Sequence, residues 1–199
     1  MEMKTAYDAL ILAGGRGARL GGKDKGWIMW GGLPLVEHAL AVLSKQTPPP
    51  ARILISANRN VDAYQQTGHV VVMDERPDFM GPLAGIEAGL MRCKKNNLLV
   101  IPCDAPHLPA DLFEKLQQAL TDHPDKVAAY AVTSESAQPL CCLLKPSVAG
   151  VLGKQLDAGQ GAAQTWLDGL EAIPVQFDDA ASFTNFNTTE AIQAQRNPS

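Results

Sequence analysis

The chain has 199 residues, of which 46% are hydrophobic and 19% are charged, and its formal net charge is -4. These values are typical of one globular domain with a substantial core. An acidic balance without a broad basic face excludes a general nucleic-acid-binding protein. No apolar stretch is long enough to span a bilayer, and the N-terminal segment lacks the apolar core of a signal peptide. We therefore expect a cytoplasmic protein with no membrane partner.

The first predicted element is an apolar strand at residues 9–13, which opens into the glycine-rich basic loop LAGGRGARLGGKDKG at residues 12–26. Glycines let backbone N–H groups approach an anion closely, and the basic side chains of the loop add positive charge. A plain turn needs roughly two to five residues, whereas this loop uses about a dozen after a buried strand. The sequence therefore predicts that the loop binds phosphate groups.

Two common phosphate-binding motifs do not match this loop. In GxGxxG, the third glycine would fall on Leu20. The Walker pattern fits from Gly17 to Lys23, but Asp24 stands where a Ser or Thr hydroxyl would hold Mg²⁺. The loop therefore excludes an ordinary P-loop NTPase.

Strand and helix patterns alternate along most of the chain. Apolar, β-rich runs predict strands, and segments that begin at proline with apolar residues at helical spacing predict helices. This alternation predicts an α/β protein with a parallel sheet, helices on both faces, and ligands at the carboxyl ends of the strands. The predicted strands are residues 9–13, 52–57, 69–73, 98–102, 127–132 and 140–144, and the predicted helices are residues 34–46, 82–95 and 109–121.

The alternation weakens after about residue 133, where Pro139, Pro146 and Pro174 interrupt it. We expect a single domain over residues 1–199, with its main part at about 1–132. A small C-terminal annex at about 133–199 would complete the second half of a cleft.

Polar groups follow the predicted strands at the points where these strands stop. Because the carboxyl ends of parallel strands share one rim, we expect the glycine-rich loop, residues 56–59, Asp74 and Asp104 to lie together. Asp104 precedes the helix predicted at Pro109 by several residues, which favours Mg²⁺ binding over helix capping. Asp74 either binds a ligand or bonds its own turn, and Asn58 either forms an Asx turn or contacts a base or ribose.

Two further segments present groups suited to ligands. Gly81 and Pro82 begin a helix whose N–H groups can face an anion or a heterocycle edge, while Gly85 also suits close helix packing. Asn185 and Asn187 lie two positions apart, so an extended backbone sends both amides to one face. Such amides suit a ligand rich in donors and acceptors, with a capping turn as the alternative.

In these motifs the chain resembles the molybdenum cofactor guanylyltransferases, members of the Rossmann-like nucleotidyltransferase superfamily. The resemblance implies a Rossmann-like, doubly wound fold and the Mg²⁺-dependent transfer of GMP from GTP to molybdopterin, which yields a guanine dinucleotide cofactor and pyrophosphate. It makes residues 1–132 the nucleotide-binding half and residues 133–199 the acceptor-binding half. The matching segments, in order along nearly the whole chain, are LAGGRGARLGGKDKG, PLVEHAL, SANRN, residues 74–86, PCDAPHLP and NFNTTEAI.

The resemblance also implies roles for individual residues. Lys25 and Arg19 correspond to triphosphate ligands, and with Asp104, the implied Mg²⁺ ligand, they form the implied catalytic set. The implied nucleotide contacts are Leu12, Ala13 and Gly14 at the guanine and ribose edge, Gly15 beneath the phosphates, and Lys25, Asn58, Asp74 and Asp104. The acceptor side comprises Gly81, Pro82, Asn185 and Asn187.

Two positions depart from the family pattern. Ser56 stands where some members carry an asparagine, which weakens the assignment of Asn58 as a nucleotide ligand. Residues 158–167 contain no basic residue, whereas members often carry an arginine there within a GxR-type segment. The second departure points to altered affinity for the phosphate of the acceptor.

The expected chemistry needs no general base from the protein. The attacking group would be the acceptor's own phosphate, which is close to dianionic at neutral pH because its second pKa is about 6. Lys25, Arg19 and a Mg²⁺ ion on Asp104 would neutralise the triphosphate and stabilise the departing pyrophosphate. The resemblance implies as partners GTP, molybdopterin, molybdenum-insertion proteins and molybdoenzyme chaperones.

Two other functions stay open on the residues alone. One is a related nucleotidyltransferase that uses CTP or a sugar phosphate acceptor, since only the resemblance favours guanine. The other is a non-catalytic protein that binds GTP and docks a partner.

Overall fold

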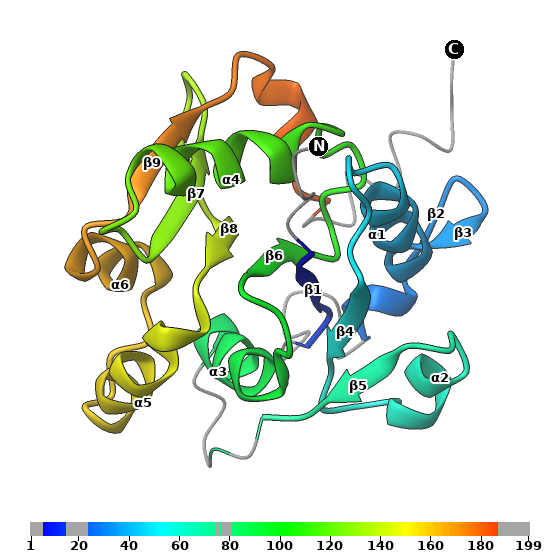
Figure 1. Ribbon diagram of the computed structural model, residues 1–199. Helices are drawn as coiled ribbons and strands as arrows, with labels where there is room; N and C mark the ends of the chain where they lie inside the picture. The colour runs from blue at the N-terminus through cyan, green and yellow to red at the C-terminus, as the bar shows by residue number, and fades with distance from the viewer. Residues whose placement is uncertain (1–5, 15–23, 75, 77–80, 187–199) are drawn as a thin grey trace.

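The computed structural model describes residues 6–14, 24–74, 76 and 81–186, and the predicted contacts Gly15, Arg19 and Asn187 lie outside these ranges. Within the ranges, the strands form one seven-stranded sheet in the order β5-β4-β1-β6-β8-β7-β9 (Figure 1). A separate hairpin pairs β2 (Met29–Trp30) with β3 (Leu33–Pro34). The strands of the sheet are β1 (Asp8–Leu12), β4 (Arg52–Ser56), β5 (Val70–Val72), β6 (Leu98–Pro102), β7 (Ala128–Val132), β8 (Ala137–Leu144) and β9 (Ile173–Gln176).

Strand β1 lies at the centre of the parallel part of the sheet and is buried along its whole length. Buried parallel strands consist of nearly continuous apolar runs, which is why this strand is visible in the sequence. β1 pairs in parallel with β4 on one side and with β6 on the other, and the register places Leu12 opposite both Ser56 and Pro102. The carboxyl ends of the three strands therefore lie in one row.

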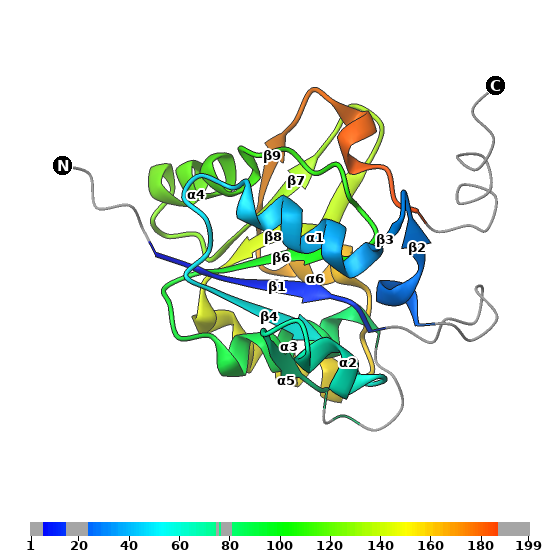
Figure 2. The same cartoon turned by 90° about the vertical axis from the view of Figure 1, so that its right-hand side faces the viewer.

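Helices cover both faces of the sheet, as the alternating pattern predicts (Figure 2). On one face, α1 and α4 pack Leu43 and Leu116 into a core cluster with Ile11 of β1. On the other face, α3 and α5 pack Ile86 and Leu152 against Leu10. Successive residues of β1 thus enter opposite cores, as the period of two in a strand requires. The helices are α1 (Leu35–Ser44), α2 (Val61–Gln65), α3 (Pro82–Arg92), α4 (Leu112–Asp122), α5 (Ala149–Asp157) and α6 (Ala163–Gly169), with short 3-10 helices η2 (Lys25–Trp27), η3 (Pro146–Val148) and η4 (Ala180–Phe183).

The fold class is confirmed as α/β with a mostly parallel sheet. The bounds of all three predicted helices need correction, least for the one predicted at residues 34–46, which is α1 (Leu35–Ser44). The helix predicted at residues 109–121 begins at Leu112, because Leu112 N donates to Pro109 O at 3.2 Å and closes a turn before it. The helix predicted at residues 82–95 ends at Arg92, because Cys93 has an extended backbone with φ -63° and ψ 129°. None of the described helices has the length and apolarity needed to cross a membrane.

The part of the chain predicted to form a C-terminal annex adds β8 and β9 to the same sheet. β8 lies between β6 and β7 and runs antiparallel to both, and β9 pairs in parallel with β7 at the sheet edge. Pro139 lies where the register of β8 against β7 shifts between Tyr130 and Ala131, so a bulge accommodates it. Pro174 lies in the edge strand β9, where a missing N–H costs little. The sequence patterns do not predict α2, α5, α6 or β9.

Gln46 joins the end of α1 to the start of α4. Its side chain is buried, its amide nitrogen donates to Pro109 O at 2.9 Å, and its amide oxygen accepts from Phe113 N at 3.0 Å. The second bond satisfies a backbone N–H in the first turn of α4, which the helix itself leaves unpaired. Gln46 therefore fixes the orientation in which α4 covers the sheet.

Replacing Gln46 with alanine removes a partner from buried backbone groups, and we expect the free energy of unfolding to fall by about 1–3 kcal/mol. Gln118→Ala is the matched control, because the Gln118 amide donates to Asp122 Oδ1 at an exposed site on α4. The control should change stability by less than about 0.5 kcal/mol. Urea denaturation measures both variants, and equal losses would show that Gln46 does not hold α4.

Candidate active site

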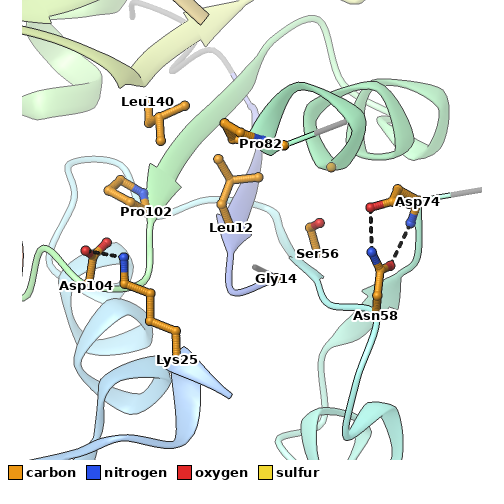
Figure 3. Close-up of a pocket in the computed structure, with 12 residues that line it drawn as sticks. Leu12, Gly14, Lys25, Ser56, Asn58, Asp74, Pro82, Pro102, Asp104 and Leu140 are labelled. Atoms are coloured by element: carbon orange, nitrogen blue, oxygen red, sulfur yellow. Dashed lines mark hydrogen bonds and ion pairs between the residues drawn. The ribbon is translucent and has the colours of Figure 1, made fainter. Parts of the chain in front are cut away.

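A cleft of about 320 Å³ opens at the carboxyl ends of β1, β4 and β6 (Figure 3). The start of α3 and one residue of β8 complete its wall. The segments predicted to share a rim therefore do lie together, as far as the structure describes them. The lining residues are Leu12, Gly14, Lys25, Ser56, Asn58, Asp74, Gly81, Pro82, Gly85, Pro102, Asp104 and Leu140.

The strand register builds the floor of the cleft from Leu12, Ser56 and Pro102, which lie opposite one another. Ala13 N and Gly14 N both donate to Ser56 O, at 3.0 and 2.8 Å, so the chain after β1 stays joined to β4. Ala13 does not line the cleft, because its buried side chain packs in the core under α1 and α4. Leu12 and Gly14, on either side of it, do reach the cleft.

Lys25 and Asp104 form an ion pair at one end of the cleft (Figure 3). Lys25 Nζ lies 2.5 Å from Asp104 Oδ2, and the aspartate side chain is 3% exposed whereas the lysine side chain is 26% exposed. Phe186 N donates to Asp104 O at 2.9 Å and so holds the aspartate backbone.

Lys25 Nζ and Asp104 Oδ2 carry opposite charges in direct contact, so electrostatic attraction holds the two side chains together. Among the described residues, Asp104 Oδ2 accepts no hydrogen bond although it is buried. A buried carboxylate oxygen therefore keeps acceptor capacity at the wall of the cleft.

Asn58 and Asp74 form a reciprocal pair on the opposite side of the cleft (Figure 3). Asn58 Nδ2 donates to Asp74 Oδ2 at 2.5 Å, and Asp74 N donates to Asn58 Oδ1 at 3.0 Å. The pair joins the segment after β4 to the segment after β5. The sequence left two roles open for Asn58, an Asx turn or a contact with a ligand. It did not predict this pairing with Asp74.

The start of α3 approaches the floor of the cleft closely. Gly81 precedes the helix with φ 72°, a conformation that favours glycine, and Pro82 occupies its first turn. A Cβ on Gly85 would lie 2.4 Å from Ser56 Oγ and 3.2 Å from Leu12 Cδ2. The GPLAG segment thus places a helix N-terminus at the cleft and also packs tightly through Gly85.

Asn185 is exposed and does not line the cleft. Its neighbour Phe186 is nevertheless fixed beside the rim, with its ring centroid 4.9 Å from that of Trp30. Trp30 also meets the His107 ring at 5.1 Å. The aromatic contacts therefore hold the segment of Asn185 next to the turn that carries Asp104.

Four cleft residues were not assigned as contacts in the sequence: Ser56, Gly85, Pro102 and Leu140. Pro102 ends a predicted strand just before Asp104. A search for residues at the ends of predicted strands could therefore have identified it. Leu140 carried no such signal, because its place depends on the insertion of β8 beside β6. No three His, Cys, Asp or Glu side chains in the described ranges gather into a ready-made metal cluster.

Comparison with known proteins gives consistent matches in sequence and fold. Residues 9–173 match the sequence profile of the MobA-like NTP transferase domain. The molybdenum cofactor guanylyltransferase of Cupriavidus metallidurans is 43% identical, over 96% of this chain and 95% of the relative. The protein of the same name from Polynucleobacter asymbioticus is 44% identical, over 92% of each chain.

Solved structures share the fold at low sequence identity. The molybdopterin-guanine dinucleotide biosynthesis protein A of Archaeoglobus fulgidus gives a TM-score of 0.69 at 21% identity, over 94% of this chain and 95% of that chain. A CMP:2-keto-3-deoxy-manno-octonic acid synthetase complexed with CTP gives a TM-score of 0.72 at 13% identity, over 97% of both chains.

Replacing Gly85 with alanine should lower the free energy of unfolding by about 1–3 kcal/mol, because the new methyl group would overlap Ser56 and Leu12. Gly150→Ala is the matched control, since Gly150 is also helical and, among the described residues, no atom beyond its chain neighbours and its own helix backbone lies within 4 Å of the new methyl group. The control should gain about 0.5–1 kcal/mol from helix propensity. Stability curves in urea compare the two, and an equal gain in both would contradict the close approach of α3 to the floor.

Proposed function

Because the chain belongs to the MobA-like NTP transferase domain family, we propose that it transfers GMP from GTP to molybdopterin, forming molybdopterin guanine dinucleotide and pyrophosphate. Relatives named molybdenum cofactor guanylyltransferase span nearly the whole chain at 43% and 44% identity, which supports this reaction. The structural observation that carries the proposal is the Lys25–Asp104 pair at one end of a cleft where the parallel strands end.

The cleft has two chemically different ends. Lys25 and Asp104 supply charge at one end, where the phosphates of a nucleotide would lie. Leu12, Pro82 and Leu140 supply apolar surface between that end and the Asn58–Asp74 pair. A volume of about 320 Å³ is at the lower end of the range for small-molecule sites.

We assign the nucleotide to the first 132 residues and the acceptor to a second part at about 133–199. Leu140 supports this division, because it brings β8 to a cleft otherwise built by the first part. The proposed nucleotide contacts are Leu12, Ala13, Gly14, Gly15, Lys25, Asn58, Asp74 and Asp104, with Arg19 as a further triphosphate ligand. The proposed acceptor contacts are Asn185 and Asn187 from the second part, together with Gly81 and Pro82, which the first part contributes to the cleft.

Asp104 fits the requirement for a Mg²⁺ ligand. Its Oδ2 is buried at the cleft and, apart from the ion pair with Lys25, has no hydrogen-bond partner among the described residues. Mg²⁺ is commonly held by one or two carboxylates together with substrate phosphates and water, so a cluster of three protein ligands is not required. Bound there, the ion would neutralise negative charge on the triphosphate.

The proposed reaction does not need a general base from the protein. The phosphate of the acceptor is the nucleophile, and it is largely ionised at neutral pH because its second pKa is about 6. Lys25 would stabilise the negative charge that develops on the departing pyrophosphate. The proposal includes a cytoplasmic location and, as protein partners, molybdenum-insertion proteins and molybdoenzyme chaperones.

The reaction is tested by measuring pyrophosphate released by the purified protein with molybdopterin, Mg²⁺ and either GTP or CTP. We expect release with GTP alone. Release with CTP alone would instead assign the protein to the related cytidylyltransferases. If neither nucleotide gives pyrophosphate release but GTP binds tightly, a non-catalytic GTP-binding protein would be favoured.

Replacing Asp104 with asparagine should lower kcat at least about 100-fold, as loss of a preorganised electrostatic group does in other enzymes, while the fold is kept. Asp8→Asn is the matched control, because Asp8 is also a buried carboxylate, paired with Arg52 Nη2 at 2.7 Å at the other end of β1. The control should lose stability but keep its kcat. Steady-state kinetics and circular dichroism test both variants, and an active D104N protein would contradict the metal assignment.

A further inference from the structure

Asp24, the residue before Lys25, is held by side chains from another part of the chain. Its Oδ1 accepts from Tyr64 Oη at 2.6 Å and from Gly26 N at 3.2 Å. Its Oδ2 accepts from Asn60 Nδ2 at 3.0 Å. The end of the glycine-rich loop is thereby fastened to α2 and to the residue that precedes α2.

Tyr64 is suited to be a permanent donor to this carboxylate. The residue is 0% exposed. Burial, and then the hydrogen bond and charge of Asp24, raise the pKa of Tyr64 far above its usual value, so the hydroxyl stays protonated. The Trp27 ring lies 5.2 Å from the Tyr64 ring and packs against it. Tyr64 is therefore a fixed point in the core rather than a mobile surface group.

The fit around Gly26 shows how close this contact is. A Cβ on Gly26 would lie 2.2 Å from Tyr64 Oη. The phenol thus occupies the space that any side chain at position 26 would need. Asp24 also caps the 3-10 helix η2, which begins at Lys25.

These contacts restrain the backbone on both sides of Lys25. Asp24 is tied to Tyr64 and Asn60, and Gly26 packs against Tyr64 and donates to Asp24. A lysine side chain is long and has several rotatable bonds, so the position of its ammonium group depends on where its backbone is held. With that backbone fixed, Lys25 Nζ reaches Asp104 Oδ2 across the end of the cleft.

We propose that Asp24, Tyr64 and Asn60 form a latch that positions Lys25 for the triphosphate. They are positioning residues, because they act through Lys25 and do not line the cleft themselves. The role of the latch rests on the proposed function, in which Lys25 binds the phosphates of GTP. A purely structural role for the same contacts would affect stability without acting through Lys25.

A double-mutant cycle between Tyr64→Phe and Lys25→Ala separates these two roles. Tyr64→Phe removes only the hydroxyl and keeps the ring against Trp27. We expect it to lower kcat/KM for GTP about tenfold or more, since a hydrogen bond to a charged group is lost. In the Lys25→Ala background the same change should cost less than about twofold, because the residue through which it acts is gone.

Tyr7→Phe is the matched control. Tyr7 directly precedes β1 and is also 0% exposed. Its hydroxyl donates to Pro48 O at 3.0 Å. Burial likewise raises its pKa. This variant also loses a phenol hydrogen bond, here to a neutral backbone carbonyl, and its kcat/KM for GTP should stay unchanged.

Asn60→Gly gives a second route if Tyr64→Phe does not fold. Asn60 is exposed and has φ 48°, a conformation that glycine adopts readily, and its side chain makes no capping bond to α2. The change removes the side chain whose amide donates to Asp24, while glycine can keep the positive φ of this position. We expect a smaller loss of kcat/KM in the same direction, again absent in the Lys25→Ala background.

The same cycle is measured on the Kd for GTP with Mg²⁺ by calorimetry, which does not require transfer to an acceptor. If pyrophosphate release fails but the cycle on Kd shows coupling to Lys25, the proposed reaction is wrong and the latch stands. Equal losses in both Lys25 backgrounds, or no loss from either latch variant, would overturn the latch while leaving the transfer reaction intact.

Discussion

The parallel pairing of β1 with both β4 and β6 is the constraint on which the site depends. The register puts Leu12 level with Ser56 and Pro102, so the segments after these strands leave the sheet at the same edge. Helices on both faces then bury the strands and keep this edge in place. As a result, Lys25 and Asp104 meet at one cleft although they are far apart in the sequence.

Buried carboxylates at the two ends of the sheet show how surroundings decide the role of a charge pair. At the amino end, Asp8 accepts from Arg52 Nη2 at 2.7 Å and from Lys94 N at 2.8 Å, which is a structural arrangement. At the carboxyl end, Asp104 meets Lys25 beside a cleft, and its Oδ2 accepts no hydrogen bond among the described residues. Burying a charge is costly, so retaining it next to an open cleft fits a ligand-binding role better than a stabilising one.

Much of the fold and part of the site follow from local patterns in the sequence. An apolar run that stops at an acid defines a position on the rim, and both Asp74 and Asp104 were found in this way. The partner of Asn58 was not found, because its amide can bond its own turn or a side chain brought close by the neighbouring strand. Ala13 shows a limit of a motif taken residue by residue, since the period of two in a strand turns its side chain into the core.

Local sequence patterns are enough to identify the apolar strands, the helices that begin at proline, the glycine-rich basic loop and the acids at the strand ends. Each of these depends on neighbouring residues, whose spacing sets the local backbone conformation. Tertiary packing was needed to show that β8 inserts between β6 and β7, which brings Leu140 to the cleft, and that Tyr64 holds Asp24. These partners lie far apart in the chain, so their choice depends on how whole layers pack, a long-range property that no local pattern records.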